Sequence, residues 1–175
     1  MIKETYNFIP YIYVEIYIYY YSIIKMNHME KAIELSLENV SSGKGGPFGC
    51  VIVSNNNEII SVGKNEVICN NDPSAHAEIV AIRNACKKRN SPFLNDCEIY
   101  TSCEPCPMCY GAIKWAKINK IFYCNTRKDA QHIGFDDNFI YDEIINKRQN
   151  MIQLNHPQGI KAFEEWEQCD KKKIY

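Results

Sequence analysis

The stretch TSCEPCPMC, residues 101–109, places three cysteines at regular intervals around a proline. The first, Cys103, ends the apolar run CEIYTSC, which predicts a buried strand. Pro105 then leads into a helix predicted for CPMCYGAIKWAK, because proline is tolerated where a helix begins. Cys106 and Cys109 open this helix three residues apart, so both sulfurs can face one point, and the positive helix end favours thiolates. These residues therefore require a strand that leads directly into a helix carrying two potential metal ligands.

Strands and helices alternate through the rest of the chain. Asn55–Asn57 separate two runs rich in β-branched residues, which predicts a β-hairpin. Ile79, Ile82 and Cys86 recur at helical spacing and are expected on the inner face of one helix. We expect strands at residues 50–53, 58–64, 97–102 and 120–124, helices at 76–88 and 106–117, and helical patterns in the tail at 137–147 and 161–169. This alternation is typical of an α/β domain with three layers, α/β/α, around one sheet.

The first 25 residues differ in composition from everything that follows. Residues 6–24 are almost entirely Tyr and Ile. This segment has too few strongly apolar residues to span a membrane, and it lacks the cleavage site of a signal peptide. A new helical pattern begins at Asn27, with its expected apolar stripe and stop at Met29, Ile33, Leu37, Val40 and Gly43. We therefore expect a low-complexity leader at residues 1–25 and one domain at residues 26–175, with no membrane association.

A second group of candidate functional residues is His76 to Glu78, at the start of the helix predicted for residues 76–88. Two thiolates together with an imidazole select zinc, so His76 is a candidate third ligand. Three protein ligands leave one position open, as in a catalytic zinc site. Glu78 is then the natural acid and base, because zinc lowers the pKa of a bound water to about 7 and a nearby carboxylate can take its proton.

Three simpler interpretations compete with this catalytic site. Cys103 could be a fourth ligand of a closed structural zinc site, although Pro105 separates it from the helix and Glu78 would then have no role. An iron–sulfur cluster would need a further cysteine after Cys109 in the usual run. Glu78 could also be an ordinary carboxylate in the first turn of a helix, where the helix dipole favours it.

Composition excludes some classes of function. The chain has 175 residues and a formal net charge of -1, which gives no general attraction to nucleic acid. Its nine cysteines are odd in number and partly lie in apolar runs, unlike the even spacing of a secreted disulfide framework. We therefore expect a reducing compartment, the cytoplasm.

The combination of H-x-E with P-C-x-x-C is the signature of zinc deaminases that act on nucleobases. From Met26 to Tyr175 the chain resembles the cytidine-deaminase superfamily in PFGCVIV, NDPSAHAEIVAIRNAC and TSCEPCPMCYGAIKWA. Within it, GFDDNFIYDEI at residues 134–144 and the terminal Tyr175 resemble the bacterial guanine deaminases. The resemblance implies a cytidine-deaminase-like fold with a central mixed sheet of about five strands.

The resemblance also implies the chemistry and the residues that perform it. The reaction would be zinc-dependent hydrolysis of guanine to xanthine and ammonia, with Glu78 as proton shuttle. The tail, residues 127–175, would close the active site of a partner subunit in a homodimer with exchanged C-terminal segments. The implied zinc ligands are His76, Cys106 and Cys109; the implied catalytic residues are Glu78 and Asp137; the implied purine contacts are Phe48, Asn65, Ala77, Trp115, Phe135 and Tyr175.

Rival functions share much of this pattern. A tRNA adenosine deaminase has the same H-A-E and a similar E-P-C-x-M-C motif, but the neutral charge and the lack of a basic C-terminal helix argue against it. A cytosine deaminase would need a pocket built for a single ring. A structural zinc protein without catalysis is the least favoured, because Glu78 is present.

Overall fold

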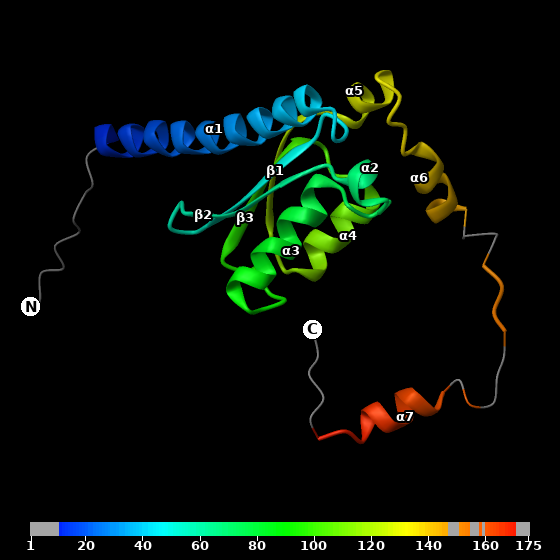
Figure 1. The fold of residues 1–175 in the computed structure, drawn as a ribbon. Helices are drawn as coiled ribbons and strands as arrows, with labels where there is room; N and C mark the ends of the chain where they lie inside the picture. Colours follow the sequence, from blue (N-terminus) through cyan, green and yellow to red (C-terminus); the bar gives the residue numbers. More distant parts are fainter. Residues whose placement is uncertain (1–10, 147–150, 155–157, 159, 171–175) are drawn as a thin grey trace, which may run out of the picture. The chain divides into compact units, whose positions relative to one another are not determined.

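The computed structural model describes residues 11–146, 151–154, 158 and 160–170. It contains two compact units, Met1–Arg127 and Lys128–Tyr175, and each is described by itself. The first unit holds a β-sheet with helices on both faces (Figure 1). This confirms the expected three-layer α/β class.

The sheet contains four strands in the order β2-β1-β3-β4. β1 pairs antiparallel with both β2 and β3, whereas β3 pairs parallel with β4, so the sheet is mixed as expected. The described residues therefore supply one strand fewer than the approximate five that the resemblance implied, and the segment after β4 forms the helix RKDAQH. The strand bounds are β1 Gly49–Ser54, β2 Ile59–Lys64, β3 Cys97–Cys103 and β4 Lys120–Asn125.

Alternate residues of β1 point into two separate cores. Val51 and Val53 pack against α1, Tyr11–Ser42, which covers one face of the sheet. Cys50 and Ile52 belong to the core under α3, Ala77–Arg89, and α4, Pro107–Trp115, which cover the other face (Figure 1). All six residues of β1 are buried, as expected for a central strand enclosed on both faces.

The first helix differs from the sequence prediction in its start and in its buried face. It begins at Tyr11 rather than Asn27, since no Gly or Pro interrupts the chain between Pro10 and Gly43. Met29 is buried as predicted, but Leu37 and Val40 are 61% and 54% exposed. The prediction of an apolar stripe there was wrong because polar Ser36 and Asn39 take the buried positions and bond to backbone carbonyl groups. The leader boundary at Met26 stays a prediction.

Close backbone contact fixes α3 against the sheet. A Cβ atom at Gly63 of β2 would overlap the Ala77 carbonyl oxygen and would lie 2.7 Å from the Ala81 nitrogen. Only glycine allows a strand to approach a helix this closely. The start of α3, which carries His76, is therefore held directly on β2.

The remaining helices are short. α2, Val67–Asn70, lies between β2 and α3, where the sequence analysis expected no helix. The second unit contains α6, Asn138–Ile145, and α7, Lys161–Glu167, in agreement with the helical patterns in the tail, while α5, Arg127–His132, begins at the last residue of the first unit. Among the described residues, no helix combines the length and apolar character that crossing a membrane requires.

Candidate metal centre

Two helix starts form the candidate metal centre. His76 is the N-cap residue of α3, with extended backbone, and Cys106 is the N-cap residue of α4. Pro107 occupies the first position of α4, where its fixed φ suits the helix and its missing N–H costs nothing. Cys109 follows in the first turn and is fully buried. Both helices therefore present their positive ends and their candidate ligands to the same place.

The three predicted zinc ligands come together although 30 residues separate His76 from Cys106. The Nδ1 atom of His76 lies 3.6 Å from Cys106 Sγ and 3.5 Å from Cys109 Sγ. A tetrahedral zinc ion with Zn–S of about 2.3 Å and Zn–N of about 2.1 Å places sulfur and nitrogen about 3.6 Å apart. Among the residues that the structure describes, His76, Cys106 and Cys109 form a group that could hold a metal ion, and their ligand atoms all lie within 4.8 Å of one another. The donor set and spacing fit zinc.

The pKa values of Cys106 and Cys109 are shifted in opposite directions. A hydrogen bond with the Cys109 thiol, and a second with His76, lower the pKa of Cys106 to about 4 despite its partial burial. The hydrogen bond with Cys106, together with burial, raises the pKa of Cys109. Cys106 is therefore the more acidic of the two thiols. A zinc ion favours the thiolate form of both cysteines.

Glu78 lies in the first turn of α3 and is only 6% exposed. Burial, with the nearby charge of Cys106, raises the pKa of its carboxyl, and the carboxyl also interacts with the Cys109 thiol. An exposed first-turn carboxylate would have none of these contacts. Glu78 is thus a buried acid beside the metal group, and its predicted role as proton shuttle agrees with that position.

Cys103 lies outside the metal group. It is buried at the end of β3, where its Sγ atom is 3.5 Å from the Thr126 carbonyl oxygen. Because β3 and β4 run parallel, this contact ties the end of β3 to the segment that follows β4.

Asn65 is buried in the loop after β2, against the Gly-rich loop before β1. Its carboxamide Oδ1 accepts hydrogen bonds from the N–H groups of Gly46 and Val67, each 3.4 Å long. Its carbonyl oxygen accepts from Asn39 Nδ2 of α1 at 2.9 Å, and its N–H donates to the Phe48 carbonyl at 3.2 Å. Two predicted purine contacts, Asn65 and Phe48, are therefore joined by a backbone hydrogen bond.

The other predicted purine contacts of the first unit have different environments. Ala77 is fully buried between His76 and Glu78 at the start of α3. Trp115 is the last residue of α4, is 64% exposed, and has the Lys117 ammonium 5.8 Å from its ring centre.

The predicted contributions of the tail belong to the second unit. Phe135 is 47% exposed, and Asp137 is the N-cap residue of α6. The side chain of Asp136 accepts the Asn138 N–H at 2.9 Å, so one of the two aspartates bonds to the helix start. Tyr175 lies outside the described residues, and the closure of a partner's pocket by this segment stays a prediction.

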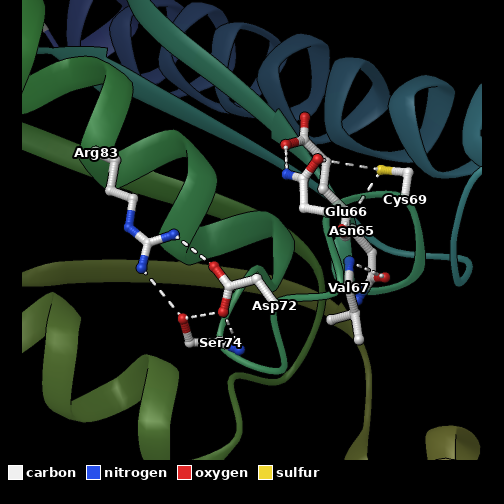
Figure 2. A network of polar contacts seen from close by, with 8 residues as sticks. Asn65, Glu66, Val67, Cys69, Asp72, Ser74 and Arg83 are labelled. Carbon is white, nitrogen blue, oxygen red and sulfur yellow. Dashed lines mark hydrogen bonds and ion pairs between the residues drawn. The ribbon is translucent and has the colours of Figure 1, made fainter.

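Sequence reasoning missed the polar network that shapes the loop between Asn65 and His76 (Figure 2). Asp72 and Ser74 in this loop bond to each other and to Arg83 of α3. The sequence contains two features of this network. One is the turn-forming stretch NNDPS, and the other is Arg83, seven positions after His76 and so on the same face of α3 two turns later. Neither signal by itself indicates a contact.

Comparison with known proteins agrees with this site. Residues 23–125 match the family model of the cytidine and deoxycytidylate deaminase zinc-binding region. The chain is 45% identical over 157 residues to the guanine deaminase of Bacillus subtilis, covering 86% of this chain and 100% of that relative. The X-ray structure of that protein matches with a TM-score of 0.82, over 86% of this chain and 98% of the other.

More distant relatives match less of their own length. A guanine deaminase from Nitrosomonas europaea matches with a TM-score of 0.59 and 28% identity, over 77% of this chain and 70% of the other. A tRNA-specific adenosine deaminase of Aquifex aeolicus is 41% identical over 88 residues, covering 50% of this chain and 56% of that relative.

The expected resemblance to bacterial guanine deaminases and the zinc cofactor are both confirmed by these matches. Since the matched family region includes both helix starts that bring His76, Cys106 and Cys109 together, the chain belongs to the zinc-binding family of cytidine and deoxycytidylate deaminases.

Proposed function

We propose that this protein hydrolyses guanine to xanthine and ammonia. The observation that carries the proposal is the similarity to the guanine deaminase of Bacillus subtilis, which extends over the whole length of that protein at 45% identity. Similarity to the tRNA-specific adenosine deaminase covers 56% of that relative. The neutral charge of the chain also favours a small uncharged base over RNA.

His76, Cys106 and Cys109 would hold the zinc ion and leave one coordination position open. A zinc ion in such a site lowers the pKa of water to about 7 and so supplies a nucleophile at neutral pH. Glu78 would accept the proton of the attacking water and deliver it to the amino group that leaves C2 of guanine as ammonia. Burial supports this role, because a raised carboxyl pKa lets Glu78 exchange protons nearer neutral pH.

Asn65 would fix the orientation of the purine. Its Oδ1 atom accepts from the backbone N–H groups of Gly46 and Val67, so the amide NH₂ is the group it would offer to an acceptor on the base. Phe48 is partly buried on the core and would pack against the ring, as would Trp115. Ala77, without a bulky side chain, would leave room for the base between His76 and Glu78.

The tail would complete the pocket of a partner subunit in a homodimer with exchanged C-terminal segments. α5, α6 and α7 have no buried residue, and α6 and α7 expose large apolar side chains. An apolar surface of this kind is typical of a segment that packs on another chain. Phe135 and Asp137, with Tyr175, would be the residues supplied in trans. The exposed apolar residues include Phe135, Phe139, Ile145, Phe163 and Trp166.

We also propose that the protein works in the cytoplasm. None of the nine cysteines forms a disulfide, five of them are exposed or half-buried, and two are candidate zinc ligands. Free thiols and a zinc thiolate site both persist in a reducing compartment.

The proposal is tested by incubating purified zinc-loaded protein with guanine, adenine, cytosine and a tRNA anticodon stem, and measuring ammonia. We expect ammonia and xanthine from guanine, with a rate that is nearly independent of salt because guanine is uncharged. A tRNA deaminase would instead lose activity steeply as salt rises, because each phosphate contact releases counterions. Deamination of the RNA with no ammonia from guanine would refute the substrate and retain the deaminase chemistry.

A further inference from the structure

Asp72, Ser74 and Arg83 form a closed ring of hydrogen bonds, which we call the loop clamp (Figure 2). Asp72 Oδ1 accepts from the Ser74 N–H at 2.8 Å and from the Ser74 hydroxyl at 2.6 Å. Arg83 donates to Asp72 Oδ2 at 3.2 Å and to Ser74 Oγ at 3.1 Å. Each of the three side chains therefore contacts the other two. The clamp joins the loop of residues 65–75 to the second turn of α3.

The clamp lies directly before the metal ligand. The His76 N–H donates to the Ser74 carbonyl oxygen at 2.8 Å, and the Ala75 N–H donates to the Asp72 carbonyl oxygen at 3.0 Å. The chain from Asp72 to His76 is thus held by backbone bonds that begin at clamp residues. This geometry sets the direction in which His76 enters α3, with ψ of 158° at the N-cap position.

The other end of the same loop carries Asn65. The Glu66 N–H donates to the Ala75 carbonyl oxygen at 2.9 Å, so the two ends of the loop are tied beside each other. Asn65 precedes the first of these residues, and His76 follows the second. A shift of the clamped segment would therefore move the metal ligand relative to the residue proposed to orient the base.

The side chains of the loop clamp are too exposed to contribute much to the stability of the whole protein. The Arg83 side chain is 56% exposed and that of Asp72 is 35% exposed. Ion pairs this accessible to water contribute little to the free energy of folding. Arg89 offers a comparison, because it makes an ion pair of 3.1 Å with Asp96 at the other end of the same helix, away from the loop.

We propose that Asp72, Ser74 and Arg83 are positioning residues, which set His76 for zinc and Asn65 for the base through the loop that joins them. They need not touch the metal or the substrate. The part that concerns Asn65 rests on the proposed guanine deaminase function, whereas the part that concerns His76 does not.

The test compares Asp72→Ala and Arg83→Gln with the matched control Arg89→Gln. Zinc affinity is measured by competition with a chromophoric chelator, and the geometry of the site by the visible absorption of the cobalt-substituted protein. We expect the two clamp variants to bind zinc about tenfold more weakly or worse, as is usual when groups that orient a ligand are removed. Their cobalt spectra should shift, while Tm falls by less than about 4 °C. The Arg89 variant should match the wild type in zinc affinity and spectrum.

Conservative variants separate positioning from folding. Asp72→Asn keeps an oxygen that can accept from Ser74 and should retain more zinc affinity than Asp72→Ala. Arg83→Lys keeps the charge but cannot reach both partners with a planar fork, so it should recover only part of the loss. If Asp72→Ala unfolds, Asp72→Asn and Arg83→Gln decide the question. Wild-type zinc affinity and cobalt spectra in those variants would overturn the inference.

The kinetics of guanine turnover distinguish a displaced Asn65 from a displaced His76. A displaced Asn65 should raise KM for guanine, in addition to any loss of kcat that follows from weaker zinc binding. Zinc affinity and cobalt spectra are measured without guanine. A wild-type protein that binds zinc but releases no ammonia from guanine would therefore refute the proposed function alone.

Discussion

At the scale of single residues, the burial of Glu78 determines what its replacement should do. Glu78→Gln keeps the shape of the side chain and removes the base, so guanine turnover should fall by about 10²- to 10⁴-fold. Zinc content should stay at one ion per chain, because Glu78 is outside the His76, Cys106 and Cys109 group. The exposed Glu58→Gln is the matched control and should retain full turnover. Near-normal turnover in Glu78→Gln would exclude the proton-shuttle role.

The cysteines give a second prediction at the same scale. Cys106→Ala removes a proposed ligand and should abolish stoichiometric zinc binding, as measured by metal analysis after dialysis. Cys103→Ala should keep one zinc per chain, since Cys103 Sγ bonds to the Thr126 carbonyl instead. Its cost should be in stability, about 1–2 kcal/mol, for the loss of a small buried side chain. Zinc loss in Cys103→Ala would favour the closed structural site.

At the scale of elements, a buried ion pair holds α1 to the sheet. Glu98 of β3 is 6% exposed and accepts hydrogen bonds from Lys25 of α1, from Lys120 of β4 and from Tyr100. Burial alone would raise the pKa of Glu98, but the bonds from Lys25, Lys120 and Tyr100 outweigh it and lower the pKa to about 2. Because the folded-state pKa lies below the unfolded one, this contribution to stability is complete above about pH 4.5 and is lost as pH falls towards 2.

Lys25→Met should therefore destabilise the protein in a pH-dependent way. We expect a loss on the order of 2 kcal/mol in the free energy of unfolding at pH 7, because the substitution removes a partner of a buried carboxylate. The loss should shrink between pH 4.5 and 2, as Glu98 takes up its proton. Urea denaturation across this pH range measures both effects. Lys31→Met removes an exposed pair with Glu34 on the same helix and serves as the control; equal losses in the two variants would contradict the prediction.

At the scale of the whole molecule, the proposed exchange of tails predicts complementation between two inactive variants. Asp137→Ala would damage the residue supplied to the partner's site, and Glu78→Gln the residue of the chain's own site. Mixing and reassociating equal amounts should restore about a quarter of the sites, since half of the dimers are mixed and each contains one intact site. Guanine turnover of the mixture measures the recovery.

A second mixture controls for this result. Asn65→Ala and Glu78→Gln would both damage the site of their own chain, so a mixed dimer would contain no intact site and should recover no activity. No recovery in the Asp137 mixture, with dimers present by sedimentation, would mean that Asp137 acts in its own chain or has no role.

The sequence by itself determined those features that depend on short stretches of chain. The Asn55–Asn57 turn with its β-branched flanks predicts the β1–β2 hairpin, which forms with antiparallel pairing. The helices that begin beside His76 and Cys106 were predicted from helical spacing and from Pro105, and both form. The motifs in these starts were also enough to predict the family and the zinc ion, because the residue types that bind a soft metal are few.

Only the tertiary structure decided features that depend on contacts between distant segments. The buried face of α1 could not be read from its apolar stripe, since Ser36 and Asn39 are buried to satisfy backbone carbonyls of their own helix and of the loops beyond it. The distances between His76 and the two cysteines depend on how α3 and α4 pack on the sheet, including the close contact of α3 with Gly63 of β2, and residue spacing along the chain does not give these distances. The contact of Arg83 with Asp72 and Ser74 is likewise invisible in sequence, because charged residues on a helix surface pair only where another segment lies within reach.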